Sequence, residues 1–371
     1  MRRLLAALLA AVGPALPAQE QFDTRGLPVD AAIVLVTAPT TGLQISDGSP
    51  AMKALRERLD KLAAQAVADG NVGPDMEKAL RTELGIDTND SQNAIAIGLK
   101  MAGPENITGV GILRVKVDPA RIEAYARKRG ISPLTAGGRT GWNALTFIDA
   151  LAQPKAGKVP EEPGPPSLGV FILDNRTIAI CDPKDAATCF ASLAGKAPSF
   201  TLNAVQKAQV ARTGQGYLFA TVDFSRLPNE IVDAVGQKMD VVNLAAGEKG
   251  PLQCAELVGH FATAAQAKLS AQQLQGLLAA APRLLAIDPA EPLEQQVMMK
   301  IVAEFVAAIQ PVKVEGKQAS FALSIETAKA IAVADQAIDM IESQAAAQAT
   351  PTPAVKASGG KKKPVGAPTT K

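Results

Sequence analysis

The side chains that most often carry catalysis are scarce in this chain. Its 371 residues include a single histidine, His260, and three cysteines. A catalytic triad or a Cys–His dyad would need His260 as its base. Cys254 lies on the same predicted strand, but six residues of strand separate the two side chains by roughly 20 Å, too far for a dyad or a shared metal ion. The phosphate-loop, dinucleotide, G-x-S-x-G and H-E-x-x-H motifs are also missing. We therefore expect no catalytic residue, no metal site and no cofactor.

Pairs of carboxylates are the remaining source of hydrolytic chemistry, because a glycosidase needs only two acids that converge on one bond. Most acidic side chains of this chain instead fall at helix starts, in turns and on exposed helix faces, where they have structural roles. Examples are Asp118, Asp182, Asp174, Glu315, Glu57, Glu77 and Glu123. A hydrolase that uses paired carboxylates is therefore kept as an alternative to a non-catalytic binding protein.

Cys181 and Cys189 form a candidate disulfide. Cys181 ends a predicted strand, and Cys189 lies eight residues later in the next predicted helix. The two sulfurs can be joined in an oxidising compartment if the helix folds back over its strand and brings the Cα atoms within about 7 Å. Burial of both cysteines as small apolar side chains is the alternative.

Arg139 and Trp142 form a candidate ligand-binding site. They lie among three glycines in the segment TAGGRTGWN, residues 135–143. On a flexible loop, a tryptophan and an arginine would make a recognition anchor. The alternative is a tight turn that packs Trp142 back onto the sheet. The proline-rich stretch that follows, residues 150–166, is predicted to be a mobile excursion or a binding loop.

The N-terminal residues predict export. The sequence MRRLLAALLAAVGPALPA begins with two arginines, continues with a short apolar run and ends in small residues, which is the order of a secretory signal peptide. We expect residues 1–18 to be removed by cleavage near Ala18, and the product to be periplasmic or extracellular. The apolar run is shorter than the roughly 20 residues that a membrane helix needs, so no membrane span is expected.

The other end of the chain, residues 346–371, is predicted to be a disordered tail because it is rich in proline, glycine and lysine. Its lysines, among them Lys361, Lys362 and Lys363, are candidates to contact an anionic envelope polymer or membrane surface. A structural envelope protein tethered through this tail is therefore a further alternative. All 36 acidic side chains precede the tail, so the body is mildly acidic and binding to nucleic acid is not expected.

The pattern of strands and helices repeats along the chain. The β-rich run at residues 30–38 predicts a buried strand, and residues 217–224 repeat it. Each run is followed by a helix and then by two units in which a hairpin leads into a helix. This order predicts an α+β fold with two similar halves, residues 27–212 and 214–345, each of mainly antiparallel sheet with helices packed on one face. Whether the halves share one sheet or form two domains stays open.

Two sequence features carry a resemblance to known proteins. One is the D-A-A-x-V-x-V strand at residues 30–36, and the other is the strand that runs into Asp-Pro, at Asp118-Pro119 and again at Asp182-Pro183. The chain resembles a class of uncharacterised secreted bacterial proteins that share both features. This resemblance implies no catalytic residues. We therefore expect an exported, non-catalytic protein that binds a partner protein, an envelope polymer or a small apolar ligand.

Overall fold

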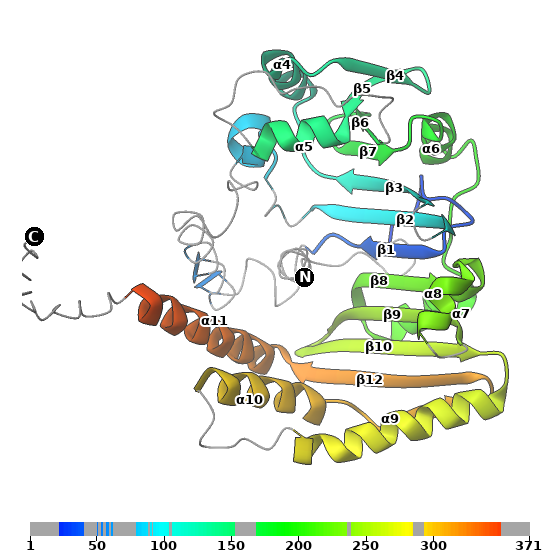
Figure 1. The fold of residues 1–371 in the computed structure, drawn as a ribbon, viewed down its shortest axis with the longest axis vertical. Helices are drawn as coiled ribbons and strands as arrows, with labels where there is room; N and C mark the ends of the chain where they lie inside the picture. Colours follow the sequence, from blue (N-terminus) through cyan, green and yellow to red (C-terminus); the bar gives the residue numbers. More distant parts are fainter. Residues whose placement is uncertain are drawn as a thin grey trace, which may run out of the picture.

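The computed structural model describes residues 22–40, 79–87, 92–103, 106–152, 168–235, 239–284 and 293–349, together with residue 90 and isolated positions between 50 and 61. Helices and a large antiparallel sheet combine in these residues, which confirms the predicted α+β class (Figure 1). The predicted signal peptide, most of the helix predicted after residues 30–38, residues 153–166 of the proline-rich stretch and residues 350–371 of the tail lie outside the described residues.

A twelve-stranded antiparallel sheet runs through the described part of the chain. Its strand order is β11-β12-β10-β9-β8-β1-β2-β3-β7-β6-β5-β4. The strands are β1 (Ile33–Thr37), β2 (Ala94–Gly103), β3 (Asn106–Arg114), β4 (Pro133–Ala136), β5 (Arg139–Asn143), β6 (Gly169–Ile172), β7 (Thr177–Cys181), β8 (Gln215–Asp223), β9 (Met239–Lys249), β10 (Leu252–Phe261), β11 (Lys313–Glu315) and β12 (Gln318–Glu326).

The strand order repeats on the two sides of the sheet centre. Strands β1 and β8 pair with each other, with Val34 opposite Thr221. Outward from β1 the order is β2, β3, β7 and β6, and outward from β8 it is β9, β10, β12 and β11. When the strands of each half are numbered along the chain and the hairpin β4–β5 is left out, both halves have the same order from the centre outward: first, second, third, fifth and fourth strand. The two halves therefore share one continuous sheet, which settles the point that the sequence left open.

Of the two helix starts that the sequence predicts at Asp-Pro, one is found and the other is shifted. Asp118 caps α4 as predicted, because its carboxylate accepts hydrogen bonds from the backbone of Ala120 and Arg121. Asp182 instead closes a turn, and α6 begins after Asp185. The helices are η1 (Leu80–Leu84), α4 (Pro119–Arg129), α5 (Ala144–Ala152), α6 (Ala186–Leu193), α7 (Ala204–Arg212), η2 (Phe224–Arg226), α8 (Asn229–Val235), α9 (Ala264–Leu284), α10 (Leu293–Ala307) and α11 (Thr327–Ala349). None of the helices described is both long and apolar enough to cross a membrane.

The core of the first half has two layers, one on each face of the sheet. Side chains alternate between the faces along each strand, and paired residues share a face. Phe171 and its strand partner Ala179 pack against α6 on one face, which we call the α6 face. Val170 and Ile178 on the opposite face pack with residues of α4 and α5. The sequence predicted neither α5, nor α7, nor the hairpin β4–β5.

Candidate functional site

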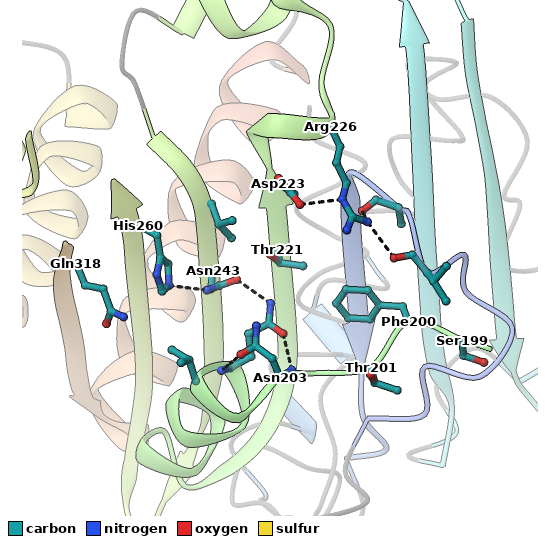
Figure 2. A pocket seen from close by; sticks show the side chains of 15 residues that line it. Ser199, Phe200, Thr201, Asn203, Thr221, Asp223, Arg226, Asn243, His260 and Gln318 are labelled. Atoms are coloured by element: carbon teal, nitrogen blue, oxygen red, sulfur yellow. Dashed lines mark hydrogen bonds and ion pairs between the residues drawn. The ribbon is translucent and has the colours of Figure 1, made fainter. Parts of the chain in front are cut away.

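A pocket of about 560 Å³ lies on the α6 face, where the two halves of the sheet meet. Strands β8, β9, β10 and β12 contribute to it, as do α7, η2 and the segments before β1 and α7 (Figure 2). The lining residues are Val29, Ala31, Ser199, Phe200, Thr201, Asn203, Val205, Gln206, Thr221, Asp223, Arg226, Val241, Asn243, His260 and Gln318.

Polar side chains from four neighbouring strands form the floor of the pocket. The register pairs Thr221 of β8 with Asn243 of β9, and His260 of β10 with Gln318 of β12. Because His260 lies two residues beyond the β10 partner of Asn243, all four side chains point to the same face. Figure 2 shows them following one another across the sheet. We call these four residues the polar row.

Two members of the polar row are held by a chain of hydrogen bonds. Gln206 of α7 donates from Nε2 to Oδ1 of Asn243 over 3.2 Å, and Nδ2 of Asn243 lies 3.1 Å from Nε2 of His260. Asn243 is 2% exposed and Gln206 is 6% exposed, so water does not compete well for these bonds. The chain of bonds therefore holds the His260 ring in a defined orientation.

Gln206, which donates the first of these hydrogen bonds, is positioned by a capping box that fixes the first turn of α7. The side chain of Asn203 accepts from the backbone of Gln206, and Oε1 of Gln206 accepts from the backbone of Asn203. One turn later, Nε2 of Gln209 donates to the main-chain oxygens of Asn243 and Glu256. These bonds attach α7 to β9 and β10 and place Gln206 above Asn243.

The opposite wall of the pocket is formed by residues 199–201, between α6 and α7. This segment is tied to the chain before β1: the backbone N–H of Phe200 donates to the oxygen of Leu27, and the hydroxyl of Thr24 donates to the oxygen of Phe200. The Oγ atoms of Ser192 and Ser199 lie 2.5 Å apart, which links the wall to α6. Phe200 thus adds an aromatic side chain to a pocket lining that also contains the aliphatic residues Val29, Ala31, Val205 and Val241.

The two charged residues that line the pocket neutralise each other. Nε of Arg226 lies 2.9 Å from Oδ2 of Asp223. Arg226 also donates to the main-chain oxygens of Val29 and Ala31. The charges of the pocket are therefore paired with each other, and its other hydrogen-bonding side chains are uncharged.

His260 is neutral in this arrangement, with its proton on Nδ1. Asn243 uses Oδ1 to accept from Gln206, so its Nδ2 must face His260 and donate to Nε2. Burial lowers the pKa of His260 below its ordinary value of 6.5, although the carboxylate of Asp240 acts in the opposite direction. If Nε2 of His260 were protonated, it and Nδ2 of Asn243 would both be donors, and no hydrogen bond could form between them.

This arrangement predicts a loss of stability in acid. The unfolded chain takes up a proton on His260 near pH 6.5, whereas the folded chain takes it up only at a lower pH. The free energy of unfolding should therefore fall as the pH is lowered through 6.5. Urea unfolding of the wild type and of His260→Gln at pH 7.5 and 5.0 measures the free energy of unfolding. Its decrease between the two pH values should be larger in the wild type. An equal drop would contradict the assigned state of the ring.

The structure places Arg139 and Trp142 on a hairpin and not on an open loop. Trp142 is 8% exposed and its ring lies 6.1 Å from that of Phe147 in the core. Arg139 is exposed, donates to the main-chain oxygen of Leu173, and lies over the Phe190 ring. Both residues thus make contacts within the fold, and neither Arg139 nor Trp142 lines the pocket.

The other predicted site residues are also outside the pocket. Cys181 at the end of β7 and Cys189 in α6 are buried free thiols. Lys361, Lys362 and Lys363 lie outside the described residues. Among the residues that the structure describes, no group of three or more His, Cys, Asp or Glu side chains could hold a metal ion.

Two features of the sequence point to residues of the pocket. Asn203 and Gln206 have the spacing of a capping box, which predicts a helix from residue 204. Asn243 and His260 interrupt strands that are otherwise largely apolar, and buried polar side chains of this kind need partners. Which partners they find depends on the strand register, which the sequence alone does not supply.

Comparisons with known proteins give little further information. No protein-family model matches the chain, and no curated protein matches it. Crystal forms I, III and IV of TP0453 are similar in structure, with TM-scores of 0.37, 0.37 and 0.39 and 10% sequence identity. The alignments cover 88%, 90% and 85% of this chain and 98%, 97% and 98% of TP0453. Similarity at this level supports no argument about function.

Proposed function

We propose that this chain is an exported, non-catalytic binding protein whose pocket takes a neutral, hydroxyl-rich ligand of the saccharide class. Export rests on the arginine, apolar and small-residue order of residues 1–18. The ligand class rests on the polar row, on the internal ion pair of Asp223 with Arg226, and on the ring of Phe200. The polar row is the observation that carries the proposal.

The polar row suits hydroxyl groups because it holds both donors and acceptors that are still available. Within the described residues, no hydrogen bond reaches the side-chain amide of Gln318, the hydroxyl of Thr221 or Nδ1 of His260. A sugar hydroxyl can donate to one neighbour and accept from another, so it matches such a mixed set. An apolar ligand would bury these groups without partners, at a cost of about 1–3 kcal/mol for each. A saccharide is therefore favoured over a small apolar ligand, which was one of the three kinds of partner expected from the sequence.

Phe200 supports the same assignment. Its side chain lines the pocket beside uncharged polar groups. Small-molecule sites commonly combine apolar surface with a few polar groups that fix the ligand's orientation. A pyranose ring has both features, since its C–H faces can lie against an aromatic ring while its hydroxyls reach the polar row.

Two features speak against a catalytic role for this pocket. His260 cannot act as a general base through Nε2, because Asn243 already occupies that lone pair. Asp223 is the one carboxylate among the lining residues, and it is paired with Arg226. A hydrolase with two convergent carboxylates would need a second acid here.

Titration with neutral saccharides tests the proposal. The full chain is titrated calorimetrically with glucose, N-acetylglucosamine and their β-linked disaccharides. We expect saturable binding of at least one of them, weakened about fivefold or more by Gln318→Ala, because a lost hydrogen bond is worth roughly 1 kcal/mol. Gln273→Ala is the matched control: this glutamine is exposed on α9, and its variant should bind as the wild type does.

Three results would overturn the assignment. One is that no saccharide binds. Another is binding that Gln318→Ala leaves unchanged, which would place the saccharide elsewhere on the molecule. The third is that N-acetylated dipeptide amides or charged amino acids bind more tightly than every saccharide, which would assign the pocket to a different ligand class.

A further inference from the structure

A pair of cysteines lies between β7 and α6, and neither lines the pocket. Cys181 is the last residue of β7 and Cys189 lies in the following helix, α6. They are 0% and 3% exposed and belong to the same apolar cluster on the α6 face. The third cysteine, Cys254, is on β10 in the other half of the sheet.

A tight connection brings the two thiols together. The backbone N–H of Asp185 donates to the oxygen of Asp182 over 2.9 Å, and that of Cys189 donates to the oxygen of Asp185 over 2.9 Å. The chain therefore turns directly after β7, and α6 folds back over the strand. As a result, Cys181 and Cys189 belong to one buried apolar cluster formed by the sheet and α6.

We propose that Cys181 and Cys189 form an intramolecular disulfide when the chain folds in the presence of a disulfide oxidant. Both thiols are buried in the folded chain, so the reaction takes place before α6 packs fully or during its transient opening. The proposal concerns the thiols themselves and does not depend on what the pocket binds.

The exchange reaction balances without a further reactant. The Cys189 thiolate attacks one sulfur of the oxidant disulfide, and the second oxidant sulfur leaves as a thiolate. Cys181 then loses its proton and attacks the Cys189 sulfur, which releases the other oxidant sulfur. The protein loses two electrons and two protons, and the oxidant becomes two thiols.

The bond would restrain the helix that leads into the pocket wall. Helix α6 ends at Leu193, and Ser192 bonds to both Pro198 and Ser199 of the wall segment. A link from β7 to α6 reduces the conformational freedom of the unfolded chain and opposes the detachment of α6. We expect its reduction to lower the thermal midpoint by on the order of 5 °C.

Counting alkylated thiols tests the proposal. The full chain is unfolded in a reductant, refolded with either a mixture of oxidised and reduced glutathione or the reductant alone, unfolded again in iodoacetamide, and weighed intact. One alkylated cysteine is expected after oxidative refolding and three after reductive refolding. Trypsin cuts after Lys184, between the two cysteines, so the bond should join the peptides 177–184 and 185–196.

Variants separate this disulfide from other pairings. Cys254→Ser should still yield the linked peptides, and Cys189→Ala should leave both remaining cysteines alkylated. Wild-type protein that refolds with native circular dichroism but has three alkylated cysteines would overturn the proposal. A link between Cys254 and either partner would overturn it as well. A thermal midpoint that falls on reduction in the wild type and not in Cys189→Ala would support the proposed restraint.

Discussion

Replacing Phe171 with alanine is expected to lower the free energy of unfolding by about 3–5 kcal/mol. The side chain is fully buried on the α6 face, and its ring meets that of Phe190 edge-on at 5.3 Å between centroids. Gly141 and Gly169 leave room for this ring, since a Cβ at either position would come within 2.6 Å of it. The substitution therefore leaves a cavity beside two glycines, which have no side chains that could move into it.

Urea unfolding of the wild type and of Phe171→Ala measures the loss of unfolding free energy. The slope of this free energy against urea concentration should be the same for both proteins, which indicates that the denatured state is unchanged. Phe305→Ala is the matched control, because Phe305 is on α10 and is 38% exposed. Its loss should stay below about 1 kcal/mol. Equal losses in the two variants would show that Phe171 does not have the packing role assigned here.

Replacing Asn243 with aspartate should reverse the titration of His260. The new carboxylate keeps one oxygen for Gln206 but turns a second acceptor toward Nε2 of His260, which must then carry a proton. The adjacent negative charge favours the imidazolium, so the pKa of His260 should rise from below 6.5 to above it. The stabilising contribution of the pair would be complete below pH 6.5 and would be lost as the pH rises through the new pKa.

A proton NMR titration can follow this change directly, because the chain has one histidine and thus one imidazole to observe. Asn175→Asp is the control, since it adds the same charge in the turn between β6 and β7. The pKa of His260 should remain below 6.5 in that variant. If it also stays below 6.5 in Asn243→Asp, the hydrogen bond between Asn243 and His260 is not what selects the neutral ring.

The fold class could be predicted because it depends on local patterns. Alternating apolar residues, Asp-Pro caps and glycine turns act over a few residues, and they located most strands and helices. Asp118 caps α4 as expected. Asp182 has the same Asp-Pro context but closes a turn with Lys184 and Asp185, and α6 begins after Asp185. The Asp-Pro pattern is therefore compatible with a helix cap and with a turn, so it does not by itself fix where a helix begins.

The candidate site could not be predicted in the same way. Thr221 and Gln318 lie almost a hundred residues apart, and only the pairing of four strands places them on one floor. The composition of the segment with Arg139 and Trp142, a tryptophan and an arginine among glycines, predicted a binding site. Its tryptophan fills the core, as residues of that size usually do. Local composition therefore indicates unusual residues, but it does not indicate which distant residues, such as Thr221 and Gln318, the strand register brings to one site.

The central pairing of β1 with β8 has a consequence for attempts to divide the protein. A fragment that ends near residue 212 would leave β1 as an uncovered edge, and a fragment that begins near residue 214 would do the same to β8. Such edges carry unsatisfied N–H and C=O groups that readily pair with other chains. Separately expressed fragments would therefore be prone to self-association, and mixing them would be the way to restore the missing neighbour of each.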